Sequence, residues 1–157
     1  MKKGPNSQQS VTGHLQQAPE HLFDHKLPKT RILRGKAAFD RLFSGEARTF
    51  RHAELQLRLF ISGPLPENEE SVKMAFIVKR KLGKANRRNH SKRLLREAYR
   101  RHQYYLRAAS YFAGIQLEGA LMANKLLEDF TPVNSRMETV LEKAFRFILN
   151  HKNALRS

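Results

Sequence analysis

The spacing of apolar residues predicts three helices. Apolar positions recur every three or four residues between 35 and 43, which predicts a short helix there. The strongest helical pattern of the chain runs from Arg87 to about Tyr105. A third helix is predicted to begin at Ser135, because Glu138 follows it at the spacing of a capping box. The apolar stripe of this last helix comprises Met137, Val140, Leu141, Ala144, Phe145, Ile148 and Leu149.

Four stretches have the pattern of β-strands. Residues 47–52 and 55–61 are the first two, and the second of them alternates between apolar and polar positions. Residues 72–78 and 116–123 are predominantly apolar, which is typical of buried strands. Residues 106–115 fit either a continuation of the preceding helix or a loop.

The resulting element order, αβββαβα, predicts an α+β fold. A single small sandwich domain with one four-stranded sheet packed against helices satisfies this order. We expect this domain to span residues 29–150, with a C-terminal tail over 151–157. Residues 1–28 are rich in Gln, Ser, Pro, Gly and His without a period, which predicts a disordered polar and basic tail. The alternative is that Leu22 and Phe23 pack on the domain.

The charge of the chain predicts a polyanionic partner. Thirty Lys and Arg against fourteen Asp and Glu give a net charge of +16, which repels itself unless nucleic acid or an anionic membrane offsets it. No apolar run is long enough to cross a membrane, so a membrane partner is not expected. The start of the chain lacks the apolar stretch of a secretory signal, and a cytoplasmic location is therefore expected. The absence of cysteine excludes disulfides and thiolate zinc sites.

The predicted second helix separates its cations from its apolar residues. Between Lys79 and Arg101 there are eleven Lys and Arg and one acidic residue, Glu97. At about 100° per residue, one arc of the helix carries Arg88, Asn89, Lys92, Arg93, Arg96 and Arg100. The opposite side carries Ser91, Leu94, Leu95, Ala98, His102 and Tyr105. A solvated charged face is the alternative, but such a face normally interleaves acids, because like charges four residues apart destabilise a helix. The pattern therefore favours an apolar face on the sheet and a cationic face that binds RNA.

The same segment carries an ordered signature. Residues 81–100 read KLGKANRRNHSKRLLREAYR, which resembles the K-x-G-x-A-x-x-R-N-R-x-K-R-x-x-R-E-x-x-R pattern of the protein subunit of bacterial ribonuclease P. The chain departs from the family pattern at His90, where the family has arginine, and at Lys79, where it has serine. Arg31-Ile32-Leu33-Arg34, followed by Phe39 and Phe43, is similar to the family's first helix. The positions that match the signature are Gly83, Ala85, Arg88, Asn89, Lys92, Arg93, Arg96, Glu97 and Arg100.

The resemblance, which covers about residues 25–150, implies a fold and a function. The fold would be an α+β sandwich similar to a domain of ribosomal proteins, with an unusual left-handed crossover through the basic helix. The function would be maturation of the 5′ end of transfer RNA, with Mg²⁺ held mainly by a catalytic RNA subunit and the substrate. The implied partners are the ribonuclease P RNA and precursor tRNA, without an obligatory protein partner. The residues expected to bind RNA are Lys79, Lys81, Lys84, Arg87, Arg88, Asn89, Lys92, Arg93, Arg96 and Arg100.

By analogy, the 5′ leader of the precursor would lie in a cleft between the sheet and the first helix. Phe39, Phe43 and Arg31 are expected to line that cleft, where aromatic rings can stack with unpaired bases. The alternative for Phe39 and Phe43 is a place in the core, because two Phe four residues apart on a short helix commonly pack inward.

The residues themselves predict no catalytic site on the protein. The three Asp (24, 40 and 129) are scattered, and Glu67, Glu69 and Glu70 lie in a predicted loop, whereas metal-assisted cleavage needs clustered carboxylates. The seven His show no acid–base spacing. Two other classes stay open: a structural RNA-binding protein, such as a ribosomal protein, and a DNA-binding regulator, which the strands around the basic helix disfavour.

Overall fold

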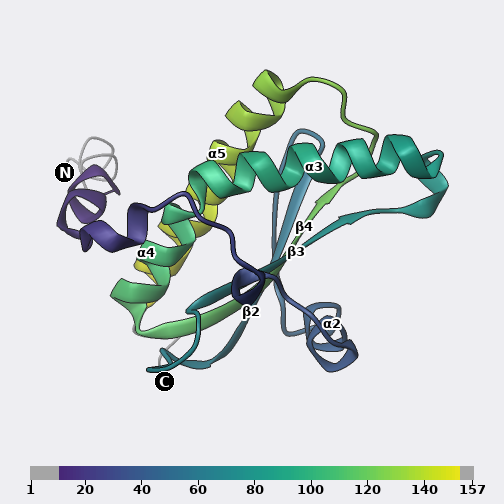
Figure 1. Cartoon of the computed structure of the whole chain (residues 1–157). Coiled ribbons are helices and arrows are strands. Elements are labelled where there is room, and N and C mark those ends of the chain that lie inside the picture. The colour runs from purple at the N-terminus through teal and green to yellow at the C-terminus, as the bar shows by residue number, and fades with distance from the viewer. Residues whose placement is uncertain (1–10, 153–157) are drawn as a thin grey trace.

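The computed structural model describes residues 11–152, which form one four-stranded sheet with helices on both faces (Figure 1). The strands, in the sheet order β1-β2-β4-β3, are β1 (Arg48–His52), β2 (Leu55–Pro64), β4 (Ile115–Ala123) and β3 (Val72–Val78). β2 pairs antiparallel with both β1 and β4, whereas β3 and β4 are parallel. Among the described residues, no helix is long and apolar enough to cross a membrane.

A crossover through two helices joins the parallel strands. A short 3₁₀ helix, η3 (Arg80–Leu82), follows β3, and α3 (Ala85–His102) and α4 (Tyr104–Ala113) lead to β4. The α+β class and the four-stranded sheet are confirmed, but the expected order lacked α4, and the predicted helix ends at His102 rather than near Tyr105. Gly114 caps the end of α4, and its φ of 69° lies in the left-handed region that glycine tolerates. The left-handed crossover stays a prediction.

The last helix, α5 (Phe130–Asn150), begins five residues before the predicted start at Ser135. Pro132 lies in its first turn, where the backbone N–H groups have no helical partner and a proline removes nothing. The Thr131-Pro132 pair therefore fits within the first turn of the helix. Ser135 lies inside the helix, and its carbonyl accepts a hydrogen bond from the Thr139 hydroxyl.

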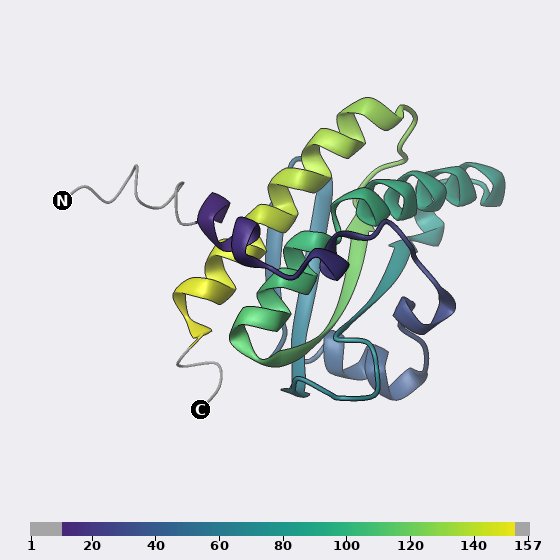
Figure 2. The ribbon, with the colours of Figure 1, turned by 60° about the vertical axis from the view of Figure 1, so that its left-hand side comes forward.

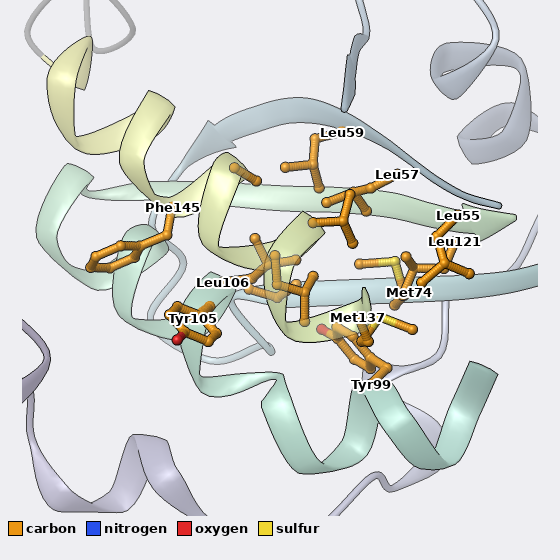
Figure 3. Packing of buried hydrophobic residues seen from close by; sticks show 14 of the residues in the cluster. Leu55, Leu57, Leu59, Met74, Tyr99, Tyr105, Leu106, Leu121, Met137 and Phe145 are labelled. Carbon is orange, nitrogen blue, oxygen red and sulfur yellow. The ribbon is translucent and has the colours of Figure 1, made fainter. Parts of the chain in front are cut away.

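The main core lies between the sheet and helices α3, α4 and α5. Alternate residues of β2 (Leu55, Leu57 and Leu59) are buried against Tyr99 of α3 and Phe145 of α5 (Figure 3). On the opposite face lies α2 (Lys36–Leu42), a helix of seven residues. Its small cluster consists of Leu33, Ala38, Leu42, Ala75 and Ala120. A helix this short covers only part of that face.

Residues 11–28 differ from the disordered tail that the composition predicted. Residues 11–17 are helical, and the 3₁₀ helix η1 (Glu20–Phe23) contacts α4 (Figure 2). Val11 and Leu22 are buried, and the Phe23 ring centre lies 5.4 Å from that of Tyr104 in α4, so the alternative in which Leu22 and Phe23 pack on the domain is correct. The carboxylate of Asp24 lies 3.0 Å from the Arg31 guanidinium and 3.1 Å from that of Arg107. The expected tails over residues 1–10 and 153–157 lie outside the described residues.

Candidate nucleic-acid interface

Helix α3 presents one buried side and one charged side. Ser91, Leu95, Ala98 and Tyr99 are buried, and the Ser91 hydroxyl accepts a hydrogen bond from the Leu127 N–H at 2.8 Å. The predicted inner face is therefore correct for the first three of these residues. Burial raises the pKa of the Tyr99 phenol, because the charged form would lose its hydration.

The free cations of α3 lie in the middle of the helix. Arg93 and Arg96 are exposed and Lys92 is half-buried, and none of the three has an acidic partner among residues 11–152. The guanidinium of Arg96 lies 5.6 Å from the centre of the Phe76 ring, which orients it without neutralising its charge. Asn89 is also exposed on this side. These residues match the predicted cationic arc.

The end of the predicted arc is neutralised. Two nitrogens of Arg100 lie 2.6 and 2.9 Å from the Glu97 carboxylate, a third donates to the His25 carbonyl at 2.8 Å, and Arg101 pairs with Glu97 at 3.0 Å. The hydrogen bond from Arg100 is the main reason that the pKa of Glu97 falls to about 2. Glu97 is therefore ionised at neutral pH, and Arg100 is held by protein groups rather than free for RNA.

The basic residues at the beginning of α3 are also partly engaged by other groups of the protein. Arg88 is half-buried and donates from Nε to the Gly83 carbonyl at 3.0 Å, so it fixes the turn that enters the helix. Arg87 pairs at 3.4 Å with Glu128, and both side chains are more than half exposed, so this ion pair is weak. The exposed ring of His90 lies 3.2 Å from the Glu128 carbonyl. His90 thus lies against the loop before α5.

The connection between β3 and α3 adds exposed cations next to the helix. Lys79, Lys81 and Lys84 are all exposed. Gly83 lies so close to Leu126 that a Cβ there would be 2.8 Å from the Leu126 Cδ1. Glycine therefore lets this basic connection pack against the segment before α5.

A groove opens on the sheet face that α2 only partly covers. Its volume is about 430 Å³. Four of its lining residues are cations and none is acidic. The lining consists of Phe43, Arg51, Gln56, Arg58, Lys79, Lys81, Leu82, Met122, Ala123 and Asn124. Lys79 and Lys81 belong to the basic connection as well, so the groove and the connection form one continuous basic surface.

Of the three residues expected to line a cleft, the structure brings only Phe43 to the groove. Phe43 follows α2 and is 52% exposed, whereas Phe39 is half-buried and packs on the α2 cluster. Arg31 is only 8% exposed and pairs with Asp24 and Glu70, both at 3.0 Å. We therefore leave Arg31 and Phe39 out of the candidate interface.

Four polar residues of the groove are not among the residues expected from the sequence, namely Arg51, Gln56, Arg58 and Asn124. Gln56 and Arg58 alternate with buried leucines along β2, so the two-residue period already placed them together on the opposite face. The missing information was that this face stays open. The signal was present in the sequence, but its meaning depended on how much of the face α2 covers.

Comparisons with known proteins identify the family. The sequence profile of the family described as Ribonuclease P matches residues 27–145. The chain belongs to the ribonuclease P family. It is therefore a protein subunit of ribonuclease P, whose partners are the ribonuclease P RNA and precursor tRNA and whose catalysis is carried by the RNA. This result decides between the RNA-subunit partner and the ribosomal or DNA-binding alternatives.

Solved structures agree on the fold. The ribonuclease P protein of Staphylococcus aureus superposes with a TM-score of 0.55 at 17% identity, covering 73% of this chain and 94% of that one. The ribonuclease P protein of Thermotoga maritima gives a TM-score of 0.54 at 23% identity, covering 71% of this chain and 96% of that one. No curated protein sequence matches the chain. At such identities the structural likeness concerns the shared fold.

Proposed function

We propose that this ribonuclease P protein uses two adjoining surfaces, one for the catalytic RNA and one for the substrate. The first is the basic helix surface, defined as Lys84, Lys92, Arg93 and Arg96 with the exposed Arg87 and Asn89. The second is the groove beside Phe43. The observation that carries the proposal is their continuity through Lys79 and Lys81, which lets one protein contact both RNA molecules.

The basic helix surface suits a folded RNA. Its guanidinium groups point outward from a helix that is rooted in the core through Leu95, Ala98 and Tyr99. Arginine binds phosphate through two parallel hydrogen bonds and also stacks on exposed bases. Each phosphate that the helix neutralises releases counterions, so binding should weaken with salt.

The groove suits a single strand. A half-exposed aromatic ring at Phe43 offers a stacking surface, and Arg51, Lys79 and Lys81 offer charges for the backbone. Gln56 and Asn124 add amide groups that can donate to and accept from base edges. The 5′ leader of precursor tRNA is the single-stranded RNA that a ribonuclease P substrate provides.

The Mg²⁺ that the reaction is expected to need is better held by RNA than by this protein. Among residues 11–152, no group of three or more His, Cys, Asp or Glu lies close enough to hold a metal ion. Two of the three loop carboxylates are already engaged, because Glu69 accepts from Gln116 at 3.0 Å and Glu70 pairs with Arg31 at 3.0 Å. The protein would instead reduce repulsion between two polyanions, which is otherwise a task for Mg²⁺. Precursor tRNA is made in the cytoplasm of bacteria, so a cytoplasmic location is part of this proposal.

Reconstitution at low Mg²⁺ tests this function. The full chain and its cognate RNA should cleave precursor tRNA at a Mg²⁺ concentration where the RNA alone is inactive. High Mg²⁺ should restore cleavage by the RNA alone, because excess counterions replace the protein's cations. Equal cleavage with and without the protein at low Mg²⁺ would contradict the proposal.

A further inference from the structure

We infer that Arg58 is a positioning residue of the groove, which holds the end of α2 and the ring of Phe43 as a preformed wall for stacking. The inference rests on the proposed function of the groove and concerns how its aromatic wall is kept in place. Arg58 would affect binding of the leader by holding Phe43 in position.

Helix α2 cannot hold its own position. It has seven residues, and its N-cap, Gly35, provides no side-chain hydrogen bond. Isolated helices of this length are unstable in water. Its buried face consists of Ala38 and Leu42, which pack on the small cluster that includes Ala75 and Ala120. Contacts from the sheet must therefore fix where the helix ends.

Arg58 makes such contacts with three hydrogen bonds. Its Nε donates to the Leu42 carbonyl at 2.7 Å, its Nη2 to the Ser44 carbonyl at 3.2 Å, and its Nη1 to the Thr49 hydroxyl at 2.9 Å. Carbonyls at the end of a helix lack helical partners and carry the negative end of its dipole, so a cation there is favourable. The planar guanidinium donates to these acceptors from three separate nitrogens, an arrangement that the single nitrogen of an ammonium group does not reproduce.

The base of this support is rigid. Arg58 lies opposite Thr49 of β1 and Ala120 of β4, so its backbone is paired on both sides. Helix α2 is held at a second point, where Arg41 donates to both oxygens of the Glu118 carboxylate at 2.8 and 2.9 Å. The second clamp holds the helix but does not touch Phe43, so the ring depends on Arg58.

The Phe43 ring lies against the same guanidinium. The Cζ of Arg58 is 5.3 Å from the ring centre, and among the described residues no other ring contact of Phe43 is found. A large apolar side chain that is 52% exposed adds little to packing. The guanidinium thus contacts part of the Phe43 ring, and the rest of the ring is exposed at the groove. An unpaired base can stack on that exposed part.

A double-mutant cycle on the full chain with its cognate RNA tests the inference. The affinity of the assembled enzyme is measured for precursor tRNA with a 5′ leader and for the same tRNA without one, and the ratio gives the leader contribution. Phe43→Ala should reduce that contribution by roughly tenfold, because one stacked base is lost. Arg58→Lys should reduce it by roughly three- to tenfold, because the charge stays but the guanidinium fork is lost. The double variant should match Phe43→Ala alone.

Two further variants keep the test decisive. Arg48→Lys makes the same change beside an aromatic ring on the opposite face of the sheet, where Arg48 lies 4.6 Å from the centre of Phe147, and should leave the leader contribution unchanged. Thr49→Val removes one acceptor and keeps Arg58, and should give a smaller loss that also disappears when Phe43 is absent.

The outcomes separate the inference from the function on which it rests. Additive losses in the double variant, or no loss with Arg58→Lys, would overturn the positioning role, because Arg58 would then act directly or not at all. A wild-type protein that binds both tRNAs equally well would instead overturn the leader groove itself. A folded Thr49→Val protein keeps the comparison available if Arg58→Lys lowers stability too far.

Discussion

The separation of free and engaged arginines on α3 leads to a quantitative prediction for RNA binding. Arg93→Ala with Arg96→Ala removes two cations without acidic partners among the described residues. If each contacts one phosphate, the slope of log K against log salt should become less steep by about 1.4–1.8, since each contact contributes about 0.7–0.9. Arg100→Ala with Arg101→Ala removes the same charge from the same helix, but both of these arginines pair with Glu97. Their loss should therefore change the slope much less.

Arg93→Ala with Arg96→Ala should change the unfolding free energy only slightly. Both side chains are exposed, and the one contact at stake is that of Arg96 with the Phe76 ring, which contributes about 0.5–1 kcal/mol at an exposed site. The assay is filter binding of the cognate ribonuclease P RNA over a range of salt, with urea unfolding of each variant alone. Equal slope changes for the two pairs, or a loss of several kcal/mol in unfolding free energy for Arg93→Ala with Arg96→Ala, would refute the reasoning.

Three other predictions concern stability. Asp24→Asn should lower the unfolding free energy by about 3 kcal/mol, because it leaves the buried Arg107 without a carboxylate and removes one of the two carboxylates that pair with Arg31. Asp40→Asn, which loses only an exposed pair, should change it by less than about 1 kcal/mol. The hydrogen bond from Arg31 lowers the pKa of Asp24, so the contribution of the Asp24 carboxylate to the unfolding free energy is complete above the ordinary aspartate pKa of about 4 and declines as the pH falls below it. Urea unfolding of wild type and of Asp24→Asn from about pH 7 to pH 3 should therefore give stabilities that converge. Stability curves that stay parallel would contradict this. Gly119→Ala should destabilise the protein by about 1–3 kcal/mol, since a Cβ there would lie 2.8 Å from the Met74 side chain and 2.9 Å from that of Leu59. An unchanged thermal midpoint would contradict this, because it would mean that both side chains move aside without cost.

Much of the fold is determined by local patterns in the sequence. The alternation along β2 and the apolar stripe of α5 arise from the geometry of a single strand or helix, so they can be seen without the rest of the molecule. The same holds for the buried side of α3, where Ser91, Leu95 and Ala98 were placed correctly. The ordered signature in residues 81–100 also pointed to the ribonuclease P family, which the family profile confirmed.

The sequence could not determine which charges stay free, because the partners of a charge lie far away along the chain. Asp24 and Arg107 are 83 positions apart, yet they form an ion pair that joins the segment expected to be disordered to α4. Arg31 and Arg100 carry the charge expected of RNA-binding residues, but nearby carboxylates and backbone carbonyls hold them. The groove likewise exists only because β1, β2 and the β3–α3 connection meet beside a helix too short to cover their face. Local periodicity decides which side of an element points inward, whereas only tertiary packing decides what each outward side chain meets.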